Sequence, residues 1–360
     1  MINLDGSYLE GGGQIIRTAL SLSTLTKTGF IVENIRKGRQ KPGLKNQHLY
    51  AIRTLKQQCN AYVEGDQLGS LNLNYVPRDI KGGQISVDIG TAGSITLVLQ
   101  AIMMPLMFAD KNSTITLNGG TDTKWSQPID YFAQVLAPQL RKFCKEINIK
   151  TLKRGYFPKG NGNVVVEVKP KYKLKDFNLF KDLQDKISSE VPDINLLDQG
   201  DLVQIKGISH ASQDLEPKRV ADRQAETAKA ILNKLNVPVD IRVEYNQTLS
   251  TGSGLTLWAI FSKGDEIDMN NPVILGADGL GEPRKTSENV GEEAARNLIK
   301  EIESGSPVDE HLADNLLPWL IFGGKFRAEN ISLHTKTNAW LVNNFFKDKI
   351  KIEGNLISSH

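Results

Sequence analysis

The chain has 360 residues, of which 39% are hydrophobic and 24% are charged, a composition typical of a soluble globular protein with more than one domain. Its two cysteines, Cys59 and Cys144, are too few for a disulfide framework or a metal cluster. No apolar run is long enough to cross a bilayer, and the first residues lack the regions of a signal peptide, so we expect a cytoplasmic protein without membrane contacts.

The predicted elements of the first half follow a similar pattern twice. Helices are expected over 11–26 and 44–59, and strands over 30–35, near 62 and over 71–76. The second passage predicts strands over 84–89, 113–117 and 164–168, with helices over 94–108 and 130–147. This recurrence indicates a repeated α+β unit.

The stretch from about 175 to 270 differs in character. After a charged, weakly patterned run it predicts a strand at 202–209, a polar helix at 216–235, and strands at 239–245 and 255–261. Such a self-contained set between polar flanks is typical of an inserted small α/β domain.

The last part predicts the repeated pattern once more. Helices are expected over 287–303, over 310–322 and from 338, with strands over 328–333 and 349–353. We therefore divide the chain into a first unit at 1–80, a second at 81–174, an inserted domain at 175–270 and a third unit at 271–360, which the strands flanking the insert complete.

The net charge of +3 is small, but the basic residues are unevenly placed. Between residues 34 and 63 there is no acidic side chain, whereas the basic ones are Arg36, Lys37, Arg39, Lys41, Lys45, Arg53 and Lys56. This asymmetry indicates a surface for phosphate groups, and a solvated basic face is the alternative.

Two glycine-containing segments could bind a nucleotide. Glycines 11–13 precede a predicted helix, whose free N–H groups could meet a phosphate, although a plain turn would look the same. The segment 279–286 has the length of a P-loop, but Arg284 replaces its second glycine and Pro283 removes an N–H donor. We reject the P-loop interpretation.

The five histidines do not have the spacing of a zinc site. His360 is terminal, and His210 lies in the predicted insert, where we expect it at the surface. His334 stands where a predicted strand ends and a helix begins, a place where active-site residues often lie.

Several short motifs follow one another along nearly the whole chain. They are Asp5-Gly6-Ser7, residues 10–17 (EGGGQIIR), residues 35–39 (IRKGR), residues 41–44 (KPGL), Gln47-His48-Leu49, residues 90–94 (GTAGS), residues 97–100 (LVLQ), residues 119–122 (GGTD), residues 311–314 (HLAD) and residues 334–338 (HTKTN). Together and in this order, they resemble the RNA 3′-terminal phosphate cyclase family.

The resemblance implies three repeats of a four-stranded sheet packed on two helices, plus a small α/β insert. It also implies a reaction in which ATP adenylylates a histidine, AMP passes to an RNA 3′-phosphate to give an RNA-ppA end, and the neighbouring 2′-hydroxyl closes a 2′,3′-cyclic phosphodiester. By its position, His334 matches the nucleophile, and neutral imidazole is a good nucleophile near pH 7.

The remaining site residues also follow from the resemblance. The expected phosphate-binding and catalytic residues are Arg17, Arg36, Arg39 and Gln47, because guanidinium groups clamp phosphate oxygens. Glu10 is expected to hold a divalent ion, Mg²⁺ or Mn²⁺, with ATP. The expected nucleotide contacts are Gln100, Pro128, Asp130, His311 and Asp314, with His311 against adenine. His48 belongs to the same motifs, or it packs on its helix.

Two other functions remain open. Non-cyclising relatives in RNA processing lack the histidine nucleophile, and small-molecule transferases on a related scaffold would not need ATP or RNA. His334 favours the cyclase. The RNA substrate, the acceptance of DNA, the oligomeric state and the role of the insert do not follow from the sequence.

Overall fold

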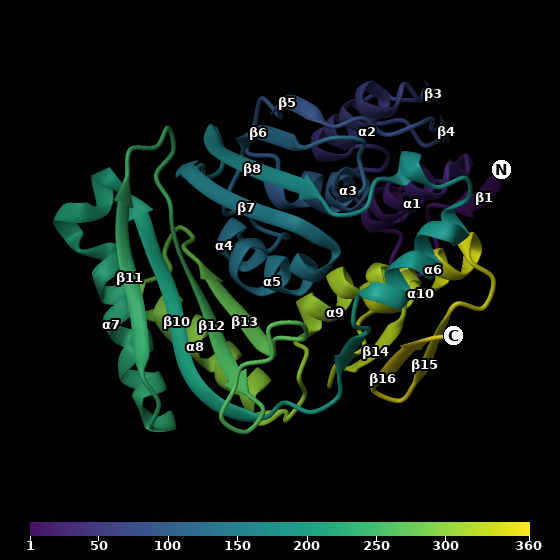
Figure 1. Cartoon of the computed structure of the whole chain (residues 1–360). Helices are drawn as coiled ribbons and strands as arrows, with labels where there is room; N and C mark the ends of the chain where they lie inside the picture. Colours follow the sequence, from purple (N-terminus) through teal and green to yellow (C-terminus); the bar gives the residue numbers. More distant parts are fainter.

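The computed structural model describes all residues, 1–360, as a mixed α/β structure with four sheets of four strands each and ten α-helices (Figure 1). This confirms the predicted α+β class. Both termini lie on the same side of the molecule (Figure 1).

The first sheet has the order β1-β2-β4-β3, with β1 and β2 parallel and the other pairs antiparallel. Its strands are β1 (Ile2–Asp5), β2 (Phe30–Glu33), β3 (Tyr62–Glu64) and β4 (Leu73–Val76). Because parallel neighbours need a crossover, α1 (Gln14–Thr26) joins β1 to β2, and α2 (Asn46–Cys59) follows.

The second sheet repeats this pairing, with the order β5-β6-β8-β7 and only β5 and β6 parallel. Its strands are β5 (Gly83–Asp88), β6 (Ser113–Gly119), β7 (Cys144–Lys153) and β8 (Gly162–Pro170), and its crossover helix is α3 (Ile95–Met107). Helix α3 packs against both α1 and α2.

The helix predicted over 130–147 is wrong at its C-terminal end. The helical segment comprises α4 (Ile129–Tyr131), a π-helical turn at Phe132–Leu136, α5 (Ala137–Leu140) and a 3₁₀ turn that ends at Phe143. Residues from Cys144 onward form β7, in which apolar Ile147 and Ile149 alternate with polar residues, a strand period that the helical pattern before it obscured.

The third sheet has the order β15-β16-β14-β9, with β9 and β14 parallel. Its strands are β9 (Ile194–Leu196), β14 (Gly324–Arg327), β15 (Ile350–Glu353) and β16 (Leu356–Ser359), accompanied by α6 (Phe180–Glu190), α9 (Glu310–Leu316) and α10 (Leu333–Phe345). The strand predicted over 328–333 is wrong: β14 ends at Arg327, and α10 begins at Leu333, earlier than predicted.

The fourth sheet has a different order, β11-β10-β12-β13, with β10 and β11 parallel. Its strands are β10 (Asp201–Ser212), β11 (Val239–Asn246), β12 (Ser253–Ser262) and β13 (Ile274–Leu280). Helices α7 (Val220–Leu232) and α8 (Ser287–Glu303) pack on one another and on this sheet at one side of the molecule (Figure 1).

Three of the four sheets thus share one order of their strands along the chain, and the fourth has another order. Two strands lie across the predicted boundaries: β9 falls within 175–270 but pairs with β14, and β13 falls within 271–360 but pairs with β12. The division into repeats and an insert, with its boundaries, stays a prediction. None of the helices has the length and apolar character needed to cross a membrane.

Candidate active site

His334 lies in the first turn of α10, whose start is fixed by Ser332: the Ser332 hydroxyl oxygen accepts a hydrogen bond from the backbone N–H of Thr335 at 3.0 Å. Asn338 on the same helix donates to the carbonyl of Asp314 at 2.6 Å and accepts from Thr18 at 2.8 Å. The start of α10 is therefore held to α1 and α9. The His334 side chain is 43% exposed and faces a cavity of about 1250 Å³.

The imidazole of His334 is oriented by Gln14. The Gln14 amide nitrogen donates to the backbone carbonyl of His334 at 2.6 Å, which leaves the amide oxygen of Gln14 in contact with Nδ1 of the ring. Because an amide oxygen only accepts, Nδ1 carries a proton, and in the neutral ring the lone pair lies on Nε2. Nε2 is the nitrogen that can act as a nucleophile.

Glu10 lies on the other side of this ring. Its Oε1 forms an ion pair with Arg39, and its Oε2 lies 2.8 Å from Nε2 of His334. Oε2 is buried and makes no hydrogen bond within the protein. An unpartnered buried carboxylate oxygen is a group that a divalent cation can satisfy.

Arg17 extends from α1 towards Gln100 on α3, and its Nε donates to the Gln100 amide oxygen at 2.9 Å. Gln100 in turn donates to Asn315 at 2.8 Å and to Gln127 at 3.2 Å. Burial lowers the pKa of Arg17 to about 10, so the guanidinium remains charged at neutral pH. Its two terminal nitrogens make no hydrogen bond within the protein and remain available to a ligand.

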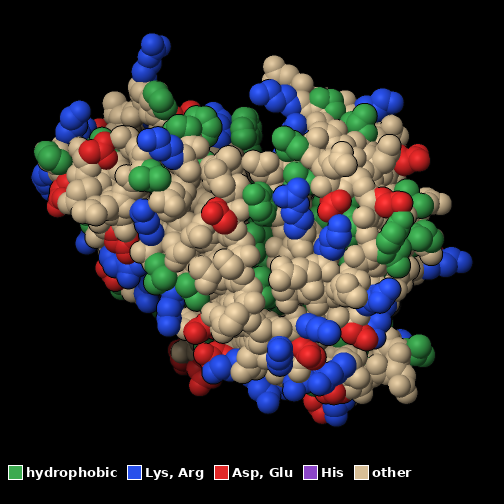
Figure 2. All heavy atoms as spheres, turned by 90° about the horizontal axis from the view of Figure 1, so that it is seen from above, with side chains coloured by type: hydrophobic (Ala, Val, Ile, Leu, Met, Phe, Trp, Pro, Cys, Tyr) green, Lys and Arg blue, Asp and Glu red, His purple; other side chains and the backbone are tan.

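Arg36 and Gln47 line the same cavity, at the loop before α2 and in its first turn. Arg36 donates through Nη1 to the carbonyls of Lys41 and Gly43, each at 2.9 Å, which fixes the basic loop. Burial, and then the neighbouring Arg39, lower the pKa of Arg36. Figure 2 shows basic and acidic side chains intermingled over the face seen from above, so that face as a whole is not basic.

His48 is buried beneath the glycine loop. Its Nδ1 accepts from the backbone N–H of Lys45 at 3.0 Å, and a Cβ on Gly13 would lie 2.0 Å from its Nε2. Burial, followed by the charges of Arg17 and Arg36, lowers its pKa well below the ordinary value, so the ring is neutral at neutral pH. His48 supports the loop by packing, and Gly13 is required for that close approach.

Helix α9 carries His311 and Asp314, which also line the large cavity. His311 meets Tyr131 edge to face, with ring centroids 6.0 Å apart. Asp314 accepts from the Ser332 hydroxyl at 2.7 Å, and burial raises its pKa. Asp314 therefore also supports the turn that carries His334.

Pro128 and Asp130 do not line the large cavity. Pro128 borders a smaller cavity of about 140 Å³ beside it. Asp130 is buried, and its Oδ2 lies 2.6 Å from Nη1 of Arg154. Nothing in this placement supports a nucleotide contact by Asp130, which stays a prediction.

The surface position predicted for His210 is wrong. The side chain is fully buried, with Nε2 at 3.1 Å from Asp122 and Nδ1 at 2.8 Å from the hydroxyl of Tyr156. Asp122, Asp130 and His210 have the spacing of a metal site. The Arg154 guanidinium, 2.6 and 3.5 Å from the two carboxylates, already supplies the positive charge there.

The structure thus brings together all predicted site residues except Pro128 and Asp130 around one cavity. Their roles there remain predictions. Sequence reasoning assigned no role to Gln14, because its partner His334 is 320 positions away and no local pattern joins the two. Its place in the glycine motif with Glu10 was the only signal. An imidazole that lies among guanidinium groups and a carboxylate at the wall of a large cavity is typical of an enzyme that handles phosphate groups.

Comparison with known proteins leads to the same class of enzyme. The profile of the family described as "RNA 3'-terminal phosphate cyclase" matches residues 8–352. Proteins named RNA 3'-terminal phosphate cyclase from Pyrococcus furiosus and Saccharolobus solfataricus are each 41% identical to the chain, across 98% of it and across 96% and 97% of their own lengths. One from Archaeoglobus fulgidus is 39% identical, covering 99% of both chains. The chain belongs to the RNA 3′-terminal phosphate cyclase family, a family of ligase-class enzymes, which confirms the resemblance found in the sequence.

Proposed function

We propose that the chain converts the 3′-terminal phosphate of RNA into a 2′,3′-cyclic phosphodiester at the expense of ATP. The full-length similarity to proteins named as cyclases supports this function. The observation that carries it is the imidazole of His334, whose Nδ1 contacts Gln14 so that the neutral ring has its lone pair on Nε2, at a cavity also lined by Arg17, Arg36 and Arg39.

The reaction has three steps at phosphorus. Nε2 of His334 attacks the α-phosphorus of ATP, and pyrophosphate leaves. An oxygen of the RNA 3′-phosphate then displaces the imidazole and takes over AMP. Finally the adjacent 2′-hydroxyl attacks the RNA phosphorus, loses its proton and expels AMP. The Nδ1–H bond to Gln14 fits the first step, because it keeps the lone pair on the attacking nitrogen.

The remaining residues bind and orient the reacting groups. The free terminal nitrogens of Arg17, with Arg36 and Arg39, would clamp phosphate oxygens and oppose the charge that develops on them. His311 would stack on the base and Asp314 would hold the ribose or the base from the same helix. Gln47 lies at the start of α2 among the guanidinium groups.

A divalent cation fits at Glu10, where the buried Oε2 lacks a hydrogen-bond donor. Mg²⁺ or Mn²⁺ bound there would neutralise phosphate charge.

The test uses two short oligoribonucleotides that differ only in their 3′ end, one with a phosphate and one with a hydroxyl. With ATP and Mg²⁺, we expect the phosphorylated one alone to become resistant to phosphatase, with release of AMP and pyrophosphate. Omission of ATP should abolish the conversion. Unchanged phosphatase sensitivity in the presence of ATP would contradict the proposal and favour a binding or assembly role.

A further inference from the structure

Two aromatic side chains are unusually exposed at the large cavity. Trp125 is 88% exposed and Phe157 is 76% exposed, the two highest values among the large hydrophobic residues of the chain. Both line the cavity that holds His334. Burial of an aromatic ring is favourable, so two rings left in water at one site point to a ligand that covers them.

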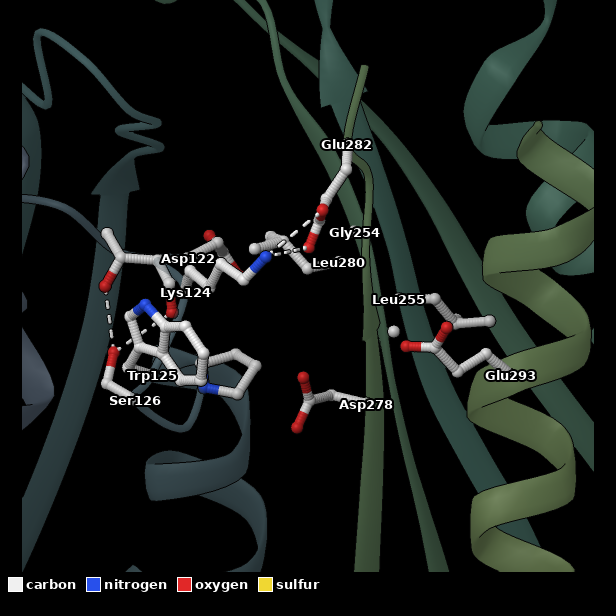
Figure 3. Close-up of a pocket in the computed structure, with 13 residues that line it drawn as sticks. Asp122, Lys124, Trp125, Ser126, Gly254, Leu255, Asp278, Leu280, Glu282 and Glu293 are labelled. Atoms are coloured by element: carbon white, nitrogen blue, oxygen red, sulfur yellow. Dashed lines mark hydrogen bonds and ion pairs between the residues drawn. The ribbon is translucent and has the colours of Figure 1, made fainter. Parts of the chain in front are cut away.

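The loop that presents Trp125 is well anchored. It follows β6, and a hydrogen bond of 2.8 Å joins the hydroxyl groups of Thr123 and Ser126 on either side. Lys124 lies 5.4 Å from the Trp125 ring centroid and forms an ion pair of 3.1 Å with Glu282, as Figure 3 shows. Trp125 itself has a φ of 72°, which is rare for a bulky residue. The ring is thus held outward at a cost in backbone energy.

Phe157 is held in a similar way between β7 and β8. The preceding Tyr156 is buried, with its hydroxyl 2.8 Å from His210. Two residues later, the N–H of Lys159 donates to the hydroxyl of Ser250 at 3.0 Å. The loop is fixed on both sides of Phe157, while the ring remains in solvent.

The surroundings of these rings suit a polyanion with flat bases. Arg36, Arg39, Lys41 and Lys45 line the same cavity. Its volume of about 1250 Å³ exceeds the roughly 300–1,000 Å³ of typical small-molecule pockets. The cavity therefore has room for a nucleotide and for the end of a nucleic-acid strand.

We infer that Trp125 and Phe157 form a stacking platform for the unpaired bases at the 3′ end of the RNA substrate. The inference rests on the proposed function, since it names how that substrate is held. Single-stranded nucleic acid is commonly bound by aromatic rings that stack on bases beside cations that follow the backbone. Every base has a π-face, so such a platform would accept an RNA end of any sequence.

Binding can be followed through Trp125 itself. Of the four tryptophans, Trp258 and Trp319 are buried and Trp340 stacks on Tyr8, so Trp125 is the one freely exposed indole. We expect a 3′-phosphorylated oligoribonucleotide to quench the tryptophan emission of the wild-type protein. The variant Trp125→Phe should lose this quenching and yet bind RNA with nearly unchanged affinity.

Dissociation constants measured by fluorescence anisotropy give the decisive comparison. Trp125→Ala and Phe157→Ala should each weaken RNA binding by about tenfold, the loss expected when one base stack is removed. Tyr62→Ala serves as the matched control, since Tyr62 is an exposed aromatic residue outside the cavity, and it should bind as the wild type does. An RNA with abasic 3′-terminal nucleotides should bind the wild type and both alanine variants equally.

The incorporation of label from α-labelled ATP, measured without RNA, separates the two proposals. Both alanine variants should accept label as the wild type does, because the rings contact RNA and not the histidine. If the wild type cyclises RNA and both alanine variants bind it as tightly as the wild type, the stacking platform is wrong and the proposed function stands. If the wild type neither takes up label nor cyclises RNA, the proposed function fails, whatever the variants bind.

Discussion

The chemistry of His334 depends on which of its ring nitrogens carries the proton. Gln14 settles this, because its amide makes two contacts with the same residue, one to the carbonyl and one to Nδ1. An amide reversed in its site would place its oxygen against the backbone carbonyl of His334, and two acceptors cannot form a hydrogen bond, so the carbonyl fixes the orientation in which the amide oxygen faces Nδ1.

Replacement of Gln14 tests this control of the tautomer. The variant Gln14→Leu keeps a similar volume but cannot accept the Nδ1 proton. We expect the rate of self-adenylylation to fall by roughly 10–100-fold, the range typical when a partner that orients a functional histidine is lost. Rapid-quench measurement with labelled ATP gives this rate.

Gln40→Leu is the matched control, because Gln40 lines the same cavity without a hydrogen bond to the ring. Its rate should match the wild type. A Gln14→Leu variant with an unchanged rate would show that the ring needs no such partner.

Sequence motifs located most of the candidate site but not its supporting contacts. Glu10, Arg39 and His334 were predicted from motifs, and they meet in the structure. His210 was predicted to lie at the surface, whereas it is buried. Asp130 is buried against Arg154, and its predicted nucleotide contact stays a prediction. Burial of this kind depends on contacts between distant segments, which one sequence does not display.

At the scale of elements, the junction of α8 and α9 concentrates negative charge. Burial, and the neighbouring Asp309 and Glu310, raise the pKa of Glu301 from 4.5 to about 7. Asp309 is buried as the N-cap of α9, where it accepts from Leu312, Gly276 and Tyr131. Ionised Glu301 therefore opposes the start of the helix that carries His311.

The direction of the pH effect follows from proton linkage. Between the two pKa values the folded chain holds a proton on Glu301 that the unfolded chain releases, so this residue makes stability fall as pH rises from about 4.5 to about 7. Glu301→Gln removes the effect.

We expect Glu301→Gln to raise Tm at pH 8 by roughly 2–4 °C, the shift produced by about 1 kcal/mol, and to change it little at pH 4. Differential scanning calorimetry at the two pH values measures this. Glu303→Gln, an exposed neighbour on the same helix, should leave Tm unchanged at both. Equal changes of Tm by Glu301→Gln at pH 4 and pH 8 would contradict the raised pKa of Glu301.

Helices and strands whose apolar residues recur with one clear period were predicted well. Segments in which that period changes from helical to strand-like, or is lost, were not. The helix over 287–303 matches α8 at both ends, because Thr286 caps it and its apolar face is continuous. A strand was predicted over 328–333, since apolar residues recur there, but residues 328–332 form the loop that leads to the Ser332 cap and Leu333 begins α10. Capping chemistry overrode the apolar pattern, and it moved His334 from a strand end into a helix.

At the scale of the whole molecule, Arg154 joins the second and fourth sheets. Its guanidinium is buried and meets Asp130 at 2.6 Å, Asp122 at 3.5 Å and Glu244 of β11 at 3.2 Å. Burial would lower the pKa of Arg154, but Asp130 and Asp122 outweigh it and raise that pKa. The same contacts tie β11 to the loop that presents Trp125.

Removal of this cation should destabilise the chain strongly. Arg154→Met leaves buried carboxylates without a partner, which typically costs about 3–5 kcal/mol. Urea unfolding followed by circular dichroism measures the loss. Arg242→Met is the matched control, because Arg242 pairs with the same Glu244 at 2.6 Å but is exposed, so its loss should stay below about 1 kcal/mol. Equal losses for the two variants would contradict the role of burial.

The sheet topology could be predicted only in outline. The sequence indicated a recurring α+β unit, and three sheets do share one order of their strands along the chain. The pairing of β9 with β14 joins strands more than a hundred residues apart, and β9 has only three residues, too few for a period. Such pairings depend on the packing of the whole chain.

The central claim is that His334 carries AMP during the reaction, and incubation with α-labelled ATP followed by a denaturing gel tests it most directly. We predict a label on the wild-type protein that is stable to alkali and lost in acid, as expected of a histidine phosphoramidate. The label should be absent from His334→Ala and retained by His360→Ala, whose histidine lies at the C-terminus away from the cavity. Full labelling of His334→Ala would contradict the account.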